Sequence, residues 1–217
     1  MSDDHEFEPV WGLPERLPGN ERMLWQGSPD WRSLAIGVFR LRAVALYFAL
    51  LLAWRGASAA YDGAGAQDTA LAVLGLLPLA LLGLGLLAML AWLSATTSVY
   101  TVTDRRVVLR IGIVLSVSFN LPYARIESAA LRPLAGGHGD IVLTLAPPDR
   151  IAYLQLWPHA RPWRLAQPEP MLRSVPEAER VATLLADALA GAADQARVAR
   201  PDRAPSDRLP STAAATA

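Results

Sequence analysis

The residues best suited to binding chemistry lie in one proline-rich segment, residues 157–173. Trp and Arg side chains are enriched among the residues that dominate binding energy at protein interfaces. Prolines restrict the backbone and so lower the entropy cost of ordering a recognition segment. We therefore predict a partner-contact loop after the last predicted strand. Its candidate residues are Trp157, His159, Arg161, Trp163, Arg164 and Arg173.

A structural interpretation of the same segment stays open beside the functional one. Tryptophan in a loop often packs inward, so Trp157 and Trp163 would then lie against the neighbouring domain while the arginines face water. Truncating a core Trp would destabilise the fold, whereas truncating an interface Trp would weaken binding alone.

The sequence contains few residues that could carry out catalysis or bind a cofactor. There is no cysteine, which excludes disulfides, thiolate metal sites and cysteine nucleophiles. The histidines are placed in a predicted tail, turn or loop, so the hydrophobic segments offer no axial imidazole for haem or a chlorin-type pigment. They are His5, His138 and His159. We expect no catalytic, cofactor-binding or metal-binding residues, and Glu127 and Asp140 are expected to be exposed strand-end carboxylates. The protein is expected not to be an enzyme.

Composition indicates a membrane protein. The chain has 217 residues, of which 53% are hydrophobic and 18% are charged, a balance too apolar for an ordinary soluble domain of this length. The formal net charge is zero, so no overall positive field attracts nucleic acid.

Two apolar segments predict a helical hairpin within residues 39–94. Residues 70–93 are uncharged and long enough to span a bilayer. Residues 43–54 lie between Arg42 and Arg55 and span only ~18 Å as a helix, so full spanning stays open. A flexible polar turn at residues 61–65 joins the two segments.

Arginine placement orients the predicted hairpin. Most arginines flank it, and Arg55 stands alone between the apolar segments beside Asp62 and Asp68. By the positive-inside rule, we expect a multi-pass membrane protein with both termini in the cytoplasm.

The chain outside the hairpin predicts a mostly β domain between two other segments. Residues 1–38 are expected to be a cytoplasmic N-terminal segment with an amphipathic helix, capped by Asp30 and lying at the membrane interface. Residues 95–190 are expected to form the β domain, and residues 191–217 a disordered tail. A capping box at residues 174–177 starts the domain's C-terminal helix. The predicted strands, antiparallel and forming a partial barrel or sandwich, are 97–103, 106–111, 114–120, 125–133, 141–146 and 151–156.

Several motifs of the chain resemble known families. The sequence ERMLWQGSP at 21–29, YTVTDRRVV at 100–108, Gly112 and RIE at 125–127 resemble the bacterial membrane-bound pleckstrin-homology (PH) family. More narrowly, FEPV at 7–10 with GLPE at 12–15, and residues 47–55 and 156–173, resemble the PuhB family of photosynthetic complex assembly proteins of purple bacteria.

These resemblances imply a fold and a function. The fold is a membrane α-helical hairpin plus an α+β, mostly β PH-like domain with one C-terminal helix. The function is that of a non-pigmented assembly factor, or chaperone, for the reaction centre and core light-harvesting complex. The implied location is the bacterial inner (intracytoplasmic) membrane. Its partners would be reaction-centre or antenna subunits, the lipid bilayer and further copies of itself. The family has three membrane segments, and whether a third exists here near residues 30–42 stays open. The alternative function is a PH-like lipid- or protein-binding module of an unrelated pathway.

Overall fold

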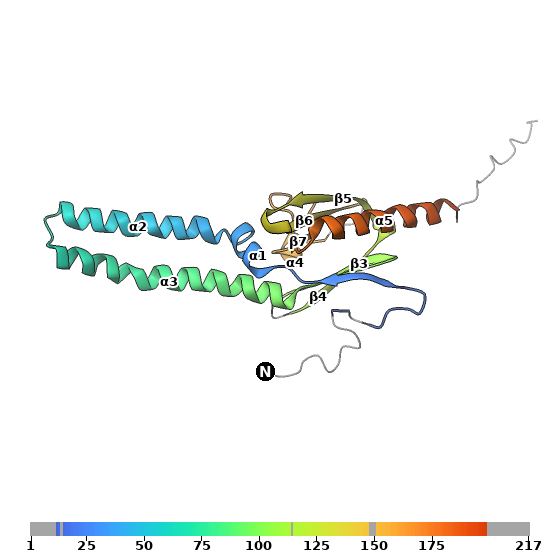
Figure 1. Cartoon of the computed structure of the whole chain (residues 1–217), viewed down its shortest axis with the longest axis horizontal. Helices are drawn as coiled ribbons and strands as arrows, with labels where there is room; N and C mark the ends of the chain where they lie inside the picture. Colours follow the sequence, from blue (N-terminus) through green and yellow to red (C-terminus); the bar gives the residue numbers. More distant parts are fainter. Residues whose placement is uncertain (1–11, 14, 114, 148–150, 199–217) are drawn as a thin grey trace, which may run out of the picture.

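The computed structural model describes residues 12–13, 15–113, 115–147 and 151–198. A helical hairpin projects from one end of a domain built of two antiparallel sheets, and the helix α5 runs over the sheets away from the hairpin (Figure 1). Within these residues, this architecture confirms the predicted fold class.

The hairpin consists of α2 (Leu41–Tyr61) and α3 (Ala66–Thr97), which pack against each other. Residues 62–65 form the turn, in agreement with the prediction. The 21 residues of α2 extend ~31 Å, because the helix continues through Arg42 and Arg55 and past the apolar run. Both helices are long and apolar enough to cross a membrane.

The outer surface of the hairpin is apolar and unusually open. Only 6% of the most apolar 18-residue stretch of each helix is buried. Leucines point outward, and Leu82, for example, has 70% of its surface exposed. A patch of this size is stable in hydrocarbon and promotes aggregation in water. The protein is therefore associated with a membrane.

The short helix α1 (Trp31–Gly37) precedes the hairpin. As predicted, Asp30 caps it by accepting a 2.7 Å hydrogen bond from the backbone N–H of Ser33. Leu34 and Ala35 are buried against α3, so this side of the predicted amphipathic helix faces protein. Its position at the membrane interface stays a prediction. Seven residues span only ~10 Å, so α1 is no third membrane segment.

The first sheet joins chain segments on both sides of the hairpin. Its strand order is β1-β2-β3-β4, with bounds Met23–Gly27, Val99–Thr103, Arg106–Ile111 and Val117–Pro122. Strand β1 pairs antiparallel with β2, so that Gly27 lies opposite Tyr100. The hairpin is therefore inserted between two adjacent strands. The predicted boundary between an N-terminal segment 1–38 and a β domain 95–190 is wrong, because β1 belongs to that domain.

The second sheet has the order β5-β6-β7, with bounds Ile126–Pro133, Gly139–Leu145 and Met171–Val175. Two assignments differ from the prediction. Residues 153–156 form the short helix α4 (Tyr153–Leu156) instead of a strand. Strand β7 contains residues 171–173, predicted as part of the partner loop, and residues 174–175, predicted as part of the helix capping box.

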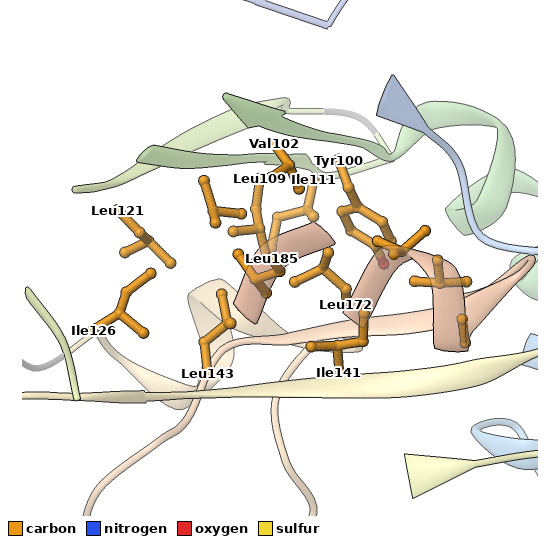
Figure 2. Close-up of a cluster of buried hydrophobic side chains, with 14 of the residues drawn as sticks. Tyr100, Val102, Leu109, Ile111, Leu121, Ile126, Ile141, Leu143, Leu172 and Leu185 are labelled. Atoms are coloured by element: carbon orange, nitrogen blue, oxygen red, sulfur yellow. The ribbon is translucent and has the colours of Figure 1, made fainter. Parts of the chain in front are cut away.

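The core lies between the two sheets and under α5 (Ala178–Val198). Figure 2 shows Leu109 and Ile111 of the first sheet pointing toward Ile141 and Leu143 of the second, with Leu185 of α5 among them. Val181 and Leu185 on one side of α5 are buried in this core.

The ends of α5 differ from the prediction. Its first residue is Ala178, so the predicted capping box at residues 174–177 lies before the helix. The helix continues past Gly191 to Val198, where we had predicted the start of a tail. Residues 199–217 lie outside the described part of the chain.

Candidate partner-binding site

The predicted loop is anchored by backbone hydrogen bonds at its base. It begins after α4 and returns into β7, and an isolated antiparallel bridge pairs Ala160 with Pro170. The Met171 N–H donates to the His159 carbonyl, and the Arg161 N–H donates to the Glu169 carbonyl. Residues 161–169 therefore project from a closed base as one lobe.

The two lobe arginines converge on one carboxylate. Arg161 Nη1 lies 2.7 Å from Glu169 Oε2, and Arg164 Nη2 lies 3.8 Å from Glu169 Oε1. The Glu169 side chain is buried, while both arginines are about half exposed. Because Glu169 holds both guanidinium groups, the arginines brace the lobe and still present part of their surface to a partner.

The two tryptophans occupy different environments. Trp163 is 93% exposed at the tip of the lobe, with a left-handed backbone (φ 66°). Trp157 is 50% exposed and stacks edge-on against Phe39, with ring centroids 5.8 Å apart. Trp157 therefore packs partly against the protein, as the structural interpretation expected, whereas the Trp163 side chain faces solvent.

His159 is completely buried in a hydrogen-bonded network. The Tyr100 hydroxyl accepts the backbone N–H of Arg173 at 3.1 Å, which leaves its own hydrogen for His159 Nδ1, 2.6 Å away. The opposite ring nitrogen, Nε2, then donates to the Ser98 hydroxyl at 3.0 Å. Burial, together with the smaller effect of the nearby Arg173 charge, lowers the pKa of His159 to about 3. His159 is a core residue, and its predicted role as a contact residue is wrong.

Arg173 is also inside the domain, with 6% of its surface exposed. Its guanidinium lies 3.4 Å from Asp140 and donates to the Ala160 carbonyl at 2.7 Å. Burial lowers the pKa of this guanidinium, which the Asp140 carboxylate opposes. Asp140 also accepts the Ser174 N–H at 2.9 Å, so our expectation of an exposed carboxylate is wrong.

The motif residues before and after the hairpin meet in the first sheet. Arg106 donates from Nε and Nη2 to the two carboxylate oxygens of Glu21, at 2.7 and 2.8 Å. The Thr103 hydroxyl donates to the same carboxylate at 2.8 Å. This arrangement fastens the chain before β1 to the β2–β3 turn. The charges of this motif therefore have a structural role, which sequence reasoning had missed because the residues are 82 to 85 positions apart.

A pocket beside the loop was also missed from the sequence. It has a volume of about 440 Å³ and lies between α1, the start of α2 and the base of the loop. It joins residues far apart in the chain, and no local spacing signals it. The charged and aromatic residues of its lining are Arg40, Arg132, Tyr153, Trp157, Trp163 and Arg173.

Comparison with known proteins gives a family and one relative. The sequence model of the family described as "Bacterial PH domain" matches residues 33–189, well over half of the chain. A protein of Rhodobacter capsulatus, titled "Uncharacterized 23.7 kDa protein in puhA 5'region", is 42% identical over 191 residues, which cover 87% of this chain and 89% of that protein. No solved structure matches the chain.

Proposed function

The chain belongs to the bacterial PH domain family, and on that premise we propose that it is a membrane-bound, non-pigmented assembly factor for the photosynthetic reaction centre and core light-harvesting complex. Its hairpin would meet client helices within the bilayer. Its β domain would contact the same clients from the membrane surface. In this role it is a binding protein and has no catalytic activity.

One observation carries the photosynthetic part of the proposal. The Rhodobacter capsulatus relative is titled by its position in the puhA 5′ region, and its similarity extends over most of both chains. That gene designation belongs to the same puh series as the PuhB family, which the motifs of this chain resemble.

The geometry supports the binding part of the proposal. In lipid, helices associate by close packing, since burial of apolar surface gives no driving force there. The exposed leucines of α2 and α3 leave an apolar surface that a client helix can contact within the bilayer. The hairpin leaves the first sheet from β1 and returns to it at β2, so a client held by the hairpin would also lie against the β domain.

Deletion of the gene tests the assembly role. We expect reaction-centre accumulation to fall severalfold during the switch to phototrophic growth, while pigment synthesis continues. Absorption spectra of membranes measure the complexes, and solvent extracts measure total pigment. Complementation with the full chain is the control. Normal complex levels in the deletion strain would refute the assembly role.

A further inference from the structure

The pocket beside the loop gathers positive charge at the end of the domain that meets the hairpin. Arg40 and Arg132 are exposed at its rim and have no carboxylate partner among the described residues. Arg173 lies in the buried wall of the pocket and forms an ion pair with Asp140. Arg132 and Arg173 are close enough to repel each other. The pocket therefore carries more positive charge than its protein neighbours balance.

A buried donor in the same wall also lacks an acceptor. The Nε–H of Arg173 has no hydrogen-bond partner within the described residues, although its Nη atoms bond Asp140 and the Ala160 carbonyl. An unsatisfied buried donor costs free energy, and a negative charge in the adjacent pocket would stabilise this guanidinium. Guanidinium groups bind phosphate oxygens through paired, charge-assisted hydrogen bonds.

The position of the pocket identifies the source of the anion. Arg40 immediately precedes Leu41, the first residue of α2, so it lies where the hairpin enters the bilayer. The next wall residues, Ile36 and Val38, are apolar, and Trp157 contacts Phe39 at the same level. Trp and Arg are typical of the headgroup region of a bilayer.

We propose that this pocket binds the phosphate of an anionic glycerophospholipid from the bilayer that holds the hairpin. Arg40 and Arg132 contact the phosphate oxygens from the rim, and the apolar wall covers the glycerol backbone. The proposal depends on membrane insertion of the hairpin and is independent of the photosynthetic role.

The other exposed arginines provide a matched control. Arg22 and Arg105 lie at the end of the first sheet where β1 begins and β2 ends, opposite the residues that join the hairpin. The Asp104 carboxylate accepts the backbone N–H of Arg22 at 3.0 Å, so Arg22 lies close to Arg105, the next residue along the chain from Asp104. Replacing both with Gln removes the same charge as replacing Arg40 and Arg132.

The test measures lipid binding to the full-length protein purified in detergent. Native mass spectrometry gives the Kd for dioctanoyl phosphatidylglycerol and for dioctanoyl phosphatidylcholine. We expect at least a tenfold preference for the phosphatidylglycerol, because the two arginines attract its net negative charge, which phosphatidylcholine lacks. The Arg40→Gln/Arg132→Gln variant should lose most of this preference, and the Arg22→Gln/Arg105→Gln variant should keep it within about twofold of the wild-type value.

Three results would overturn the proposal. They are an unchanged preference in the Arg40→Gln/Arg132→Gln variant, an equal loss in the Arg22→Gln/Arg105→Gln control, and displacement of phosphatidylglycerol by an equal concentration of inorganic phosphate. The last result would indicate a site for free anions. Arg40 has a left-handed backbone (φ 55°), so the single variant Arg132→Gln gives a second test that leaves this position unchanged. Alkaline extraction of membranes checks insertion of the hairpin separately from lipid binding and from assembly.

Discussion

At the residue scale, a neutral histidine joins the membrane side of the domain to its core. His159 accepts from Tyr100 at the start of β2 and donates to Ser98, the residue that follows the last helical residue of α3. Both contacts require one ring nitrogen to carry a hydrogen and the other to be free. Protonation would remove the acceptor that Tyr100 uses and would bury a charge next to Arg173.

The lowered pKa of His159 predicts loss of stability in acid. In the unfolded chain its pKa is near 6.5, whereas in the folded protein it is about 3. Between these values only the unfolded state takes up the proton. The free energy of unfolding therefore falls by about 1.4 kcal/mol for each pH unit below 6.5. Above pH 6.5 the contribution of His159 does not change with pH.

Thermal unfolding in detergent at pH 7.5, 6.5 and 5.5 measures this effect. His159→Gln is the reference, because its amide oxygen and nitrogen can replace both ring contacts and do not titrate. The acid-induced drop in melting temperature should be clearly smaller in the variant than in the wild type. An equal drop in both proteins would assign the acid sensitivity to other groups.

Trp163 provides the residue-scale test of the partner loop. It is 93% exposed, so Trp163→Ala should change the free energy of unfolding by no more than about 0.5 kcal/mol. If the lobe contacts a client, capture of reaction-centre or antenna subunits by the tagged full-length protein should fall severalfold. Leu115→Ala is the matched control, since Leu115 is 82% exposed in the β3–β4 connection. Full capture by Trp163→Ala would remove the tip of the lobe from the site.

Replacement of Arg161 and Arg164 together is a less direct test of the loop. Both arginines hold the buried Glu169 carboxylate, so removing them leaves that charge without its partners. The double Ala variant should therefore be less stable than the wild type. Adding Glu169→Gln should restore part of the lost melting temperature, and capture assays are meaningful only with the restored protein.

At the scale of elements, the sequence predicted what local pattern determines. The strand at residues 106–111 was predicted with the bounds that the structure has, because a short run rich in β-branched and other apolar residues between a charged turn and Gly112 defines it locally. The long helix α3 was recognised from its apolar length, and only its ends were placed too short.

The missed elements depend on distant partners. Strand β1 has five residues, and its pairing partner β2 lies beyond the whole hairpin, so no local signal links them. Strand β7 follows a proline-rich run that is typical of a loop, and it is held by β6. The same reasoning explains the site. The exposure of Trp163 follows from its loop, whereas the burial of His159 and Arg173 depends on Tyr100 and Asp140, which lie in other elements.

The pairing of β1 with β2 makes a prediction about topology. These strands precede and follow the hairpin and form one sheet, so both ends of the hairpin must lie on the same side of the membrane. The flanking arginines then favour the cytoplasm for that side. A reporter inserted at residues 62–65 should give a periplasmic signal, and a reporter after Ala217 should give a cytoplasmic one. Opposite signals would reverse the orientation, and two cytoplasmic signals would show that the hairpin does not span.

At the scale of the whole molecule, some of the small residues of the hairpin lie at the contact between its own two helices. The position of Gly83 lies against Phe48, and that of Gly56 lies against Val73, so these glycines serve contact between α2 and α3. The outward positions are mostly large residues such as Leu46, Leu82 and Trp92. Large apolar residues compete poorly with lipid for a partner helix, because small residues and polar groups provide most of the association energy in membranes.

This surface predicts transient attachment to client complexes. A protein that binds clients weakly through its hairpin should accompany newly made subunits and be absent from the finished complex. After pulse labelling, the tagged full-length protein should capture labelled reaction-centre or antenna subunits early, and the captured label should decline during the chase. Mature complexes purified through a client tag should contain far less than one copy of the protein. One copy per mature complex, retained through the chase, would make the protein a structural subunit, since a weakly held hairpin would exchange with lipid on that timescale.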